Sequence, residues 1–517
     1  MVPRPDLLSP AVPELSTTAG PLAGVLADVD DGAAVLALAV GGDGLEPGRS
    51  VDSALAALGL ERAALVATHE PRAEAGAVVR VPLPPGGQPV RTLLLVGVGA
   101  ATGADLRQAG AGLARAVKGR STLVTTLGGP AALTSAFVEG LVLGGYTVPR
   151  WGAGGPAASS APVARVVLVG RHQPVHVGRG SALARATLLT RNLANAPSNI
   201  KTPAWMAAQS RTVARRSGLA VRVWSEADLR REGFGGLLAV GGGSVAAPRL
   251  VQLGYQPGPA GRHTPHVVLV GKGITFDTGG LDIKAPEAMR LMKTDMSGAA
   301  VVLAVLAACR DLRVAVQVTG LLALAENAVS GSSYRPGDVV TQYGGTTVEI
   351  GNTDAEGRIV LADALAYADA RLAPDVLIDV ATLTGASTTA LGRAAAAGYA
   401  TDSALERALG AAGASTGEPV WPFPLFDDYR GALDSDVADL NHVAGPGFGA
   451  GSIVAALFLR EFVGGRRWAH LDIAGPARSE RDSGILARGP TGFGARLLLS
   501  YLSAAADAPV RRRDRPA

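Results

Sequence analysis

The sequence predicts an α/β protein of two domains, a smaller N-terminal domain and a larger C-terminal one. The chain has 517 residues, which is too long for one ordinary hydrophobic core. Hydrophobic residues make up 48% of it and charged residues 18%, a balance typical of packed globular proteins and not of disordered ones. Short apolar runs alternate with helical patterns along the chain, and this alternation indicates the strands and helices of an α/β fold.

The first domain is predicted over residues 1–178. Its strand-like runs are AAVLALAV (33–40), TLLLVGVG (92–99), LVTTL (123–127) and VARVVLVG (163–170). Its helix-like stretches are DLRQAGAGLARAVKG (105–119) and ALTSAFVEGLVLGG (132–145). The glycines that end the second run are typical of a dinucleotide site, but the acidic residue expected about 20 positions later is missing, so no nucleotide binding is expected there.

The second domain is predicted over residues 179–517. Its strand-like runs are LAVRVW (219–224), PHVVLVG (265–271), VAVQVTGLLAL (314–324), VLIDVATL (376–383) and WAHLDIAG (468–475). These runs are almost continuously apolar, which predicts a mixed central sheet covered by helices on both faces. The glycines of AVGGGSVAAP (239–248) lack the Lys-Ser/Thr of a phosphate-binding loop and predict a tight turn.

Charge and cysteine usage exclude several classes of protein. The net charge is +4, but the tail VRRRDRPA (510–517) supplies three of these charges, so the rest is near neutral and lacks the basic excess of a nucleic-acid binder. The single cysteine, Cys309, excludes an intramolecular disulfide, suits a reducing compartment and is predicted to be a buried structural thiol. No signal-peptide core and no apolar run of ~20 residues is found, so we expect a cytoplasmic protein without a membrane segment.

Charged residues occupy alternate positions in NTDAEGR (352–358), namely Asp354, Glu356 and Arg358. In extended chain such positions point the same way, so the charges are predicted to converge. A solvated turn is the alternative, because Asn, Asp and Gly are ordinary turn residues. The glycine at 357 predicts a tight bend at the start of the following helix, with an anion near backbone N–H groups.

Two further segments supply charged residues beside apolar elements. HVVLVGKGITFDTGG (266–280) carries Lys272 between two glycines and Asp277 after a predicted strand. LDIKAPEAMRLMKTDMSGAA (281–300) carries Lys284, and Asp295 precedes an apolar helix. A solvent-reaching lysine and a helix N-cap are the alternatives for Lys272 and Asp295.

Together the three segments indicate a two-metal site. Four carboxylates share a site only when protonated or neutralised, and two divalent cations would cancel them. Lys272 would then bind as a neutral amine, while Lys284 and Arg358 remain to stabilise an anionic transition state or a small anion. Two metals bridged by carboxylates are typical of metal-assisted hydrolysis, and oxygen ligands suit Zn, Mn and Mg alike. Since no zinc-ligand spacing occurs among the histidines, His470 and Asp472 are predicted to form a structural hydrogen-bonded pair.

The same segments belong to a longer set of strings found in one known family. The strings are NLANAPSNIKTP, GFGGLLAVGGGS, VGKGITFDTGG, MKTDMSGAA, ENAVSGSSYRPGDVV, NTDAEGRIVLADAL, ATLTGA, WAHLDIAGPA and PTGFGAR. On these, from about Asn192 to Tyr501, the chain resembles the leucyl aminopeptidase family (cytosol aminopeptidase, peptidase family M17). The first 178 residues show no matching motif, only the size and strand–helix rhythm of that family's N-terminal domain.

The resemblance implies a metal-dependent hydrolase, a leucyl aminopeptidase, that removes the N-terminal residue from peptides, preferably leucine and other apolar residues. It implies two divalent ions per subunit, Mn²⁺ or Zn²⁺, bound by Lys272, Asp277, Asp295, Asp354 and Glu356. One ion would be held by Lys272, Asp277, Asp295 and Glu356. The second ion would be held by Asp277, Asp354 and Glu356. Asp354 would also use its backbone carbonyl, and a water would bridge the ions.

Further roles follow from the same resemblance. Lys284 would polarise the peptide carbonyl, and Arg358 would hold a bicarbonate ion that serves as general base. The positions implied to line the site for the N-terminal residue are Met292, Thr382, Leu383 and Gly385. The resemblance also implies a homohexamer and a catalytic C-terminal domain. Ser297 stands where the family usually has glycine, so the backbone beside Asp295 is expected to be slightly less free.

Two other functions remain as alternatives. One branch of the family also binds DNA as an architectural protein, and the arginine-rich tail is the feature that favours this reading on the same hexamer. A dinuclear phosphoesterase would use Lys284 and Arg358 to hold phosphate.

Overall fold

The computed structural model describes residues 5–29, 34–42, 44–83, 90–129, 131–152, 157–258 and 264–505. They form two compact units: unit 1 comprises Met1–Leu188 and Glu480–Arg488, and unit 2 comprises Leu189–Ser479 and Gly489–Ala517. The chain passes from unit 1 to unit 2 within α6 (Pro174–Asn195), which also contains the boundary predicted at residue 178. The arginine-rich tail, residues 510–517, lies outside the described residues.

Unit 1 is built on one seven-stranded sheet. Its strands are, in spatial order, β1 (Glu14–Thr18), β7 (Arg165–Val169), β6 (Thr122–Thr125), β2 (Ala34–Gly41), β5 (Val90–Gly97) and β4 (Val78–Pro82), with β3 (Gly44–Leu45) paired to β2. The strands from β1 to β5 run parallel, and β4 pairs antiparallel with β5. The predicted strands at 33–40, 92–99, 123–127 and 163–170 are the four central ones of this sheet.

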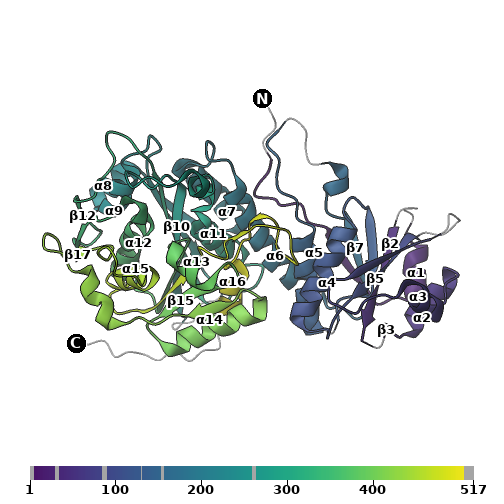
Figure 1. Ribbon diagram of the computed structural model, residues 1–517. Helices are drawn as coiled ribbons and strands as arrows, with labels where there is room; N and C mark the ends of the chain where they lie inside the picture. The colour runs from purple at the N-terminus through teal and green to yellow at the C-terminus, as the bar shows by residue number, and fades with distance from the viewer. Residues whose placement is uncertain are drawn as a thin grey trace. The chain divides into compact units, whose positions relative to one another are not determined.

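Helices cover both faces of the unit 1 sheet (Figure 1). Because side chains alternate along a strand, Leu36 and Leu38 of β2 pack in one core and Val35 and Ala37 in the other. The first core contains α1 (Leu22–Ala27), α2 (Arg49–Ala57) and α3 (Arg62–His69). The second contains α4 (Gly103–Ala116) and α5 (Ala131–Gly144).

The glycine turn after β5 leads directly into α4. There the Asp105 N–H donates to Thr102 Oγ1, and the Thr102 N–H donates to Asp105 Oδ2, each over 3.2 Å. This capping box satisfies N–H groups at the helix start with side chains of the chain itself.

Unit 2 is built on an eight-stranded mixed sheet. The spatial order is β16 (Val420–Pro422), β15 (Ala396–Ala400), β18 (Arg467–Asp472), β14 (Val376–Ala381), β10 (His266–Asp277), β11 (Gln317–Asn327), β9 (Arg249–Tyr255) and β8 (Ala220–Trp224). The four strands from β18 to β11 are parallel, whereas β15 pairs antiparallel with β18 and β9 antiparallel with β11. The predicted α/β class with a mixed central sheet is therefore confirmed.

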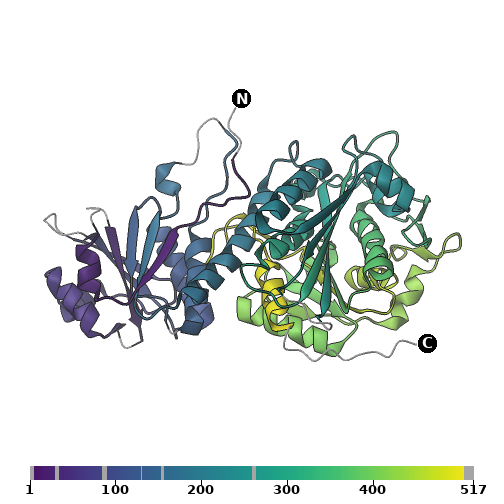
Figure 2. The same cartoon turned by 180° about the vertical axis from the view of Figure 1, so that it is seen from behind.

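Helices also cover both faces of the unit 2 sheet (Figures 1 and 2). One face carries α9 (Gly235–Gly241), α12 (Glu356–Tyr367) and α15 (Gly451–Arg460). The other carries α7 (Pro203–Ser217), α11 (Ser297–Ala308), α14 (Ser403–Thr416) and α16 (Ala495–Ala504). Cys309, directly after α11, is buried as predicted.

The remaining elements are short. They are η1 (Ala158–Ser160), α8 (Glu226–Glu232), α10 (Pro286–Met289), η2 (Met292–Thr294), β12 (Val339–Thr341), β13 (Thr347–Glu349), η3 (Thr353–Ala355), η4 (Ala368–Leu372), α13 (Gly385–Leu391), η5 (Asp427–Leu433), β17 (Leu440–Asn441), β19 (Arg478–Ser479) and β20 (Gly489–Pro490). Within the described ranges, no helix is both long and apolar enough to cross a bilayer.

Candidate functional site

The predicted charged residues come together at the end of strand β10. This strand carries Lys272 and ends at Asp277. Asp295 follows η2, Asp354 lies in η3, and Glu356 is the first residue of α12. One oxygen from each of Asp277, Asp354 and Glu356 lies within 4.8 Å of the other two, close enough for shared metal ligands.

Two lysines lie between these carboxylates. The Lys272 ammonium is 2.9 Å from Asp295 Oδ2 and 2.9 Å from Glu356 Oε1. The Lys284 ammonium is 2.9 Å from Asp277 Oδ2 and also pairs with Asp354. Four carboxylates and two ammonium groups leave a net negative charge, so the site attracts cations.

Burial and mutual repulsion perturb the pKa values of this cluster. Burial, together with the charge of Asp277, raises the pKa of Glu356 to about 8, and burial raises the pKa of Asp295 to about 6. Burial alone would lower the pKa of Lys272, but the charges of Asp295 and Glu356 outweigh it and raise that pKa above its usual range. Perturbed titration of this kind is typical of functional sites.

One carboxylate oxygen of the cluster has no partner. Asp295 Oδ2, Glu356 Oε1 and Asp354 Oδ1 pair with the two lysines, but Glu356 Oε2 is buried with neither a hydrogen bond nor an ion pair among the residues that the structure describes. A buried carboxylate oxygen without a hydrogen bond is costly unless a cation neutralises it. The donor set, oxygens plus one amine, therefore fits divalent metal ions.

A polar shell holds the ligand residues in place. Asp277 Oδ1 accepts hydrogen bonds from the Gly279 N–H, at 2.8 Å, and from the Asn327 side-chain amide, at 2.9 Å. The amide of Asn327 also donates to the Thr353 carbonyl, so it links β10 to η3. Sequence reasoning missed Asn327. The usable signal is a polar residue that ends an apolar strand-like run, and in the structure this residue pairs with Asp277.

The glycine at 357 does not form the predicted bend. It lies in the first turn of α12 and is absent from the glycines with positive φ. A Cβ at this position would lie 2.7 Å from the Lys272 ammonium nitrogen. A side chain at position 357 would overlap with the Lys272 side chain, so glycine is favoured there.

Arg358 is buried in the first turn of α12. It donates from Nη1 to the His442 carbonyl at 2.6 Å, and its Nε has no hydrogen-bond partner among the described residues. Burial lowers the pKa of Arg358 to about 10, still far above neutrality. The guanidinium is therefore charged, and its Nε–H is available to donate to an anion.

His442, which sequence reasoning missed, supports the NTDAEGR segment. Its Nε2 is 2.9 Å from the Asn352 carbonyl, and the Gly351 N–H donates to its Nδ1 over 3.3 Å. Burial, with the charge of Arg358, lowers the pKa of His442 to about 4, so the ring is neutral. Nδ1 also lies 3.1 Å from the Glu349 carbonyl. We assign the ring proton to Nε2, whose contact with the Asn352 carbonyl is the shorter of the two carbonyl contacts.

The residues predicted to bind the substrate's first residue lie on two segments beside the cluster. Met292 begins η2 and is half-buried. Thr382 follows β14; its hydroxyl donates to Asp295 Oδ1 at 2.7 Å, and its carbonyl accepts from Lys272 at 2.9 Å. Leu383 donates its N–H to Asp472 at 3.1 Å, and Gly385 begins α13.

One other sequence expectation was wrong. His470 does not pair with Asp472: its Nδ1 lies 2.5 Å from Asp379 Oδ1, because these residues are register partners on β18 and β14. Asp472 instead accepts from backbone and side-chain donors of the segment after β14. Ser297 donates its hydroxyl to the Thr294 carbonyl at 2.6 Å, so it fastens η2 to α11.

Comparison with known proteins agrees with this geometry. The model of the cytosol aminopeptidase family, catalytic domain, matches residues 188–499, and that of its N-terminal domain matches residues 39–151. A probable cytosol aminopeptidase of Geobacter sulfurreducens is 40% identical over 436 residues, which cover 81% of this chain and 86% of the relative. One from Streptomyces avermitilis is 43% identical over 456 residues, which cover 84% and 87%.

Solved structures are similar over nearly the whole chain. The bottromycin maturation enzyme BotP has a TM-score of 0.79 at 37% identity, and the match covers 92% of this chain and 100% of BotP. BotP in complex with Mn has a TM-score of 0.78 at 37% identity, covering 92% of this chain and 99% of that one. The chain therefore belongs to the cytosol aminopeptidase family, peptidase family M17, and is a metal-dependent aminopeptidase of the leucyl aminopeptidase type.

Proposed function

We propose that this chain releases the N-terminal residue of peptides, preferring leucine and other apolar residues, at the site where β10, η2, η3 and α12 meet. The observation that carries the proposal is the convergence of Asp277, Asp354 and Glu356 within 4.8 Å, beside the buried Lys272 and the half-buried Lys284. Clusters of buried carboxylates of this kind suit two-metal hydrolysis.

Two divalent cations, Mn²⁺ or Zn²⁺, would be held by the five predicted ligands. Lys272, Asp277, Asp295 and Glu356 would hold one, and Asp277, Asp354 and Glu356 the other. The unpartnered Oε2 of Glu356 supports this assignment, and so does the Mn complex of the similar BotP. When bound, such ions acidify a water molecule and polarise a peptide carbonyl.

The chain's own side chains would orient the peptide and stabilise charge. Lys284 would donate to the oxygen of the scissile carbonyl, whose negative charge grows in the transition state. Arg358 would hold a bicarbonate ion as proton acceptor, which its charged guanidinium and spare Nε donor support. Met292, Thr382, Leu383 and Gly385 would line the pocket for the first residue of the peptide.

Metal-dependent hydrolysis of leucyl-p-nitroanilide tests the proposal. We expect activity that is lost after chelation and restored by adding back Mn²⁺, Zn²⁺, Co²⁺ or Mg²⁺, at different rates for each metal. Absence of activity with two metals shown to be bound would sink the proposal.

Two substitutions test the roles of the residues. Lys284→Ala is expected to lower kcat by roughly 10²–10³-fold, a size typical of removing one transition-state donor, with metal content nearly unchanged. Asp277→Ala is expected to lose metal, because it removes a shared ligand. Metal content is measured by plasma emission spectroscopy, and equal loss of metal in both variants would contradict the role of Lys284.

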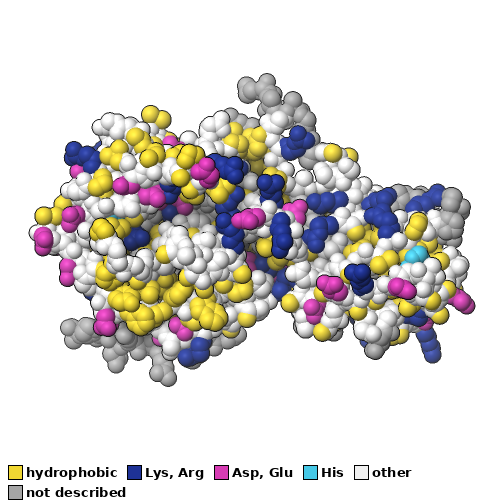
Figure 3. Space-filling view, in the orientation of Figure 1, with side chains coloured by type: hydrophobic (Ala, Val, Ile, Leu, Met, Phe, Trp, Pro, Cys, Tyr) yellow, Lys and Arg dark blue, Asp and Glu magenta, His cyan; other side chains and the backbone are white. Residues whose placement is uncertain are grey.

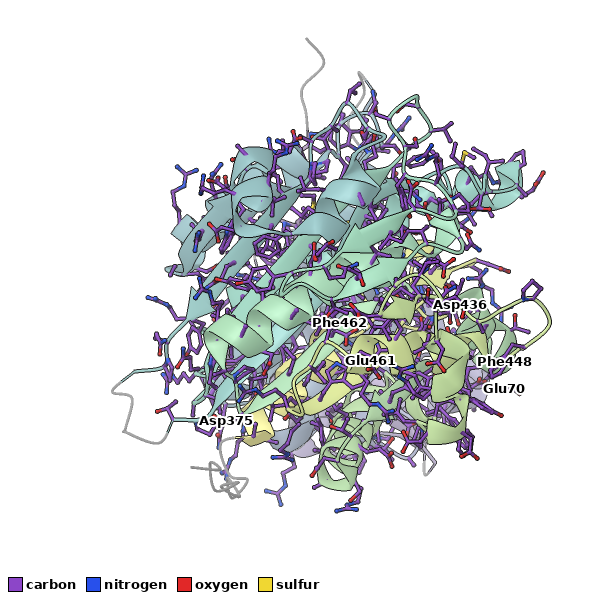
Figure 4. The ribbon with its side chains drawn as sticks, turned by 90° about the vertical axis from the view of Figure 1, so that its left-hand side faces the viewer. Glu70, Asp375, Asp436, Phe448, Glu461 and Phe462 are labelled. Atoms are coloured by element: carbon purple, nitrogen blue, oxygen red, sulfur yellow. The ribbon has the colours of Figure 1, made fainter. Side chains whose placement is uncertain are left out.

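We also propose a cytoplasmic homohexamer. Large hydrophobic side chains lie exposed on unit 2, among them Trp421, Phe426 and Phe448, and hydrophobic side chains gather on the lower part of unit 2 in Figure 3. Figure 4 shows Phe448 at the edge of unit 2. Exposed apolar surface of this kind supports assembly, and sedimentation velocity would give the number of subunits.

The DNA-binding alternative predicts a different result. Duplex binding that falls steeply with salt, is abolished by deleting residues 510–517 and is untouched by Lys284→Ala would favour it.

A further inference from the structure

A second buried lysine, Lys201, lies outside the carboxylate cluster. Its side chain is fully buried, and it follows α6 by six residues. The ammonium donates to the carbonyls of Leu193, at 3.2 Å, of Ala194, at 2.9 Å, and of Lys293. An ammonium group has three N–H donors, so each is matched by one carbonyl oxygen.

Two of these carbonyls belong to the last turn of α6. The last carbonyls of a helix have no partner within the helix, and its C-terminus favours cations. Lys293 acts at the same end, donating from its side chain to the Asn195 carbonyl at 3.1 Å. Lys201 and Lys293 together therefore cap three successive carbonyls of α6.

The third carbonyl connects this helix end to the proposed active site. Lys293 is the middle residue of η2, next to Met292 and two residues before Asp295. Met292 is proposed to line the substrate pocket and Asp295 to bind metal. Within the described residues no carboxylate pairs with Lys201, so its three bonds all go to backbone oxygens.

We infer that Lys201 is a positioning residue, which fixes η2 against the C-terminal end of α6 and so sets the places of Met292 and Asp295. The inference rests on the proposed function of that site. Lys201 does not touch the ligand carboxylates, so its effect passes through the backbone of η2. A shift of about 1 Å at such a segment costs up to ~10²-fold in rate.

Lys201→Met tests this role, because methionine keeps the length and apolar stem but removes all three donors. Lys118→Met is the matched control, since it removes a bond from a half-buried lysine to the Tyr146 carbonyl in unit 1, outside the clasp of Lys201 and η2. We measure kcat and KM with leucyl- and alanyl-p-nitroanilide, and Mn²⁺ retention against graded chelator. Calorimetry of the metal-stripped chains reports the stability of the fold.

Lys201→Met is expected to lower kcat/KM for the leucyl substrate by roughly 10–100-fold. It should also lower the leucyl-to-alanyl preference, because Met292 moves, and weaken Mn²⁺ retention, because Asp295 moves. Lys118→Met should stay within about twofold of the wild type in kcat/KM, in leucyl-to-alanyl preference and in Mn²⁺ retention. Lys201→Gln keeps two N–H donors, so it should lose less kcat/KM, less leucyl-to-alanyl preference and less Mn²⁺ retention than Lys201→Met.

Other outcomes overturn the inference. A lower melting temperature with unchanged preference and unchanged Mn²⁺ retention would show that Lys201 is merely structural. If the methionine variant does not fold, the glutamine variant carries the same comparison. An inactive wild type would refute the proposed function, whereas an active wild type equalled by both Lys201 variants would refute the positioning role alone.

Discussion

Gly357 has no side chain, and the space beside its Cα is taken by the ammonium of Lys272, 2.7 Å from where a Cβ would lie. The spacing of NTDAEGR predicts that its charges converge from extended chain. The carboxylates of Asp354 and Glu356 do converge, but they lie in η3 and at the first residue of α12, so the predicted extended chain is wrong. The spacing does not reveal why a glycine precedes Arg358, because the reason is a contact with a residue 85 positions earlier. His442 and Lys201 escape sequence reasoning for the same reason, since their partners are backbone groups that only the fold brings near.

Substituting Gly357 should damage the site more than the fold. Lys272 is held by Asp295, Glu356 and the Thr382 carbonyl, so Gly357→Ala displaces it from partners at 2.9 Å. Overpacking of this kind costs about 1–3 kcal/mol. We expect weaker Mn²⁺ retention and roughly tenfold lower kcat/KM, measured by chelator titration and leucyl-p-nitroanilide hydrolysis.

Gly410→Ala is the matched control for this substitution. Gly410 lies within α14, and a Cβ there meets no atom within 4 Å. Alanine should stabilise this helix by about 0.5–1 kcal/mol and leave metal retention unchanged. Equal metal retention in both variants would contradict the steric role of Gly357.

The neutral ring of His442 predicts a pH-dependent stability. Its pKa is about 4 in the folded chain, below the ordinary value of 6.5. The contribution of the neutral His442 ring to the unfolding free energy is therefore fully present above pH 6.5, and it is lost as the pH falls from 6.5 towards 4. At pH 5 the loss is about 2 kcal/mol of unfolding free energy.

His442→Gln should remove that part of the pH dependence. Glutamine does not titrate, and its amide can still donate to the Asn352 carbonyl. Urea unfolding at pH 7 and pH 5 should show a smaller loss in this variant than in the wild type, whereas His69→Gln in α3 should keep the wild-type loss. Identical losses in all three chains would show that His442 does not titrate as described.

At the scale of elements, the pattern of apolar residues predicted where the strands lie in the sequence, but not which strands pair in each sheet. The run at 33–40 corresponds to β2 (Ala34–Gly41) and that at 92–99 to β5 (Val90–Gly97). Apolar runs also predicted coverage on both faces, because only doubly covered strands remain apolar throughout. The order of strands in each sheet depends on long-range pairing, which leaves no local signature. The short helices α1 to α3 were missed because each shows only two or three turns of pattern.

At the scale of the whole molecule, unit 1 includes a segment from far along the chain. Residues Glu480–Arg488, here called the return segment, leave β19, join unit 1 and come back at β20. Ile485 of this segment is 8% exposed and packs in the core that contains α4 and α5. Arg115 of α4 donates to the carbonyl of Gly484. The division at a single point between residues 178 and 179 did not include this return.

Truncating Ile485 should destabilise unit 1 alone. Ile485→Ala removes buried atoms from its core and should lower the unfolding free energy by about 3 kcal/mol. Calorimetry should show that unit 1 unfolds at a lower temperature than in the wild type. At temperatures below that transition, kcat for leucyl-p-nitroanilide should be unchanged. A variant as stable as the wild type would mean that the return segment contributes nothing to this core.

The return segment also bears on how the protein is made. A ribosome finishes Leu188 roughly 300 residues before it reaches Ile485, an interval on the order of 15–60 s at translation rates of ~5–20 residues per second. Throughout that interval the nascent N-terminal unit lacks one piece of its core, and part of its apolar surface stays open to water and to chaperones. Completion of this unit is thus tied to the near completion of translation, so a chain released early would leave the N-terminal unit unfinished and exposed to proteolysis.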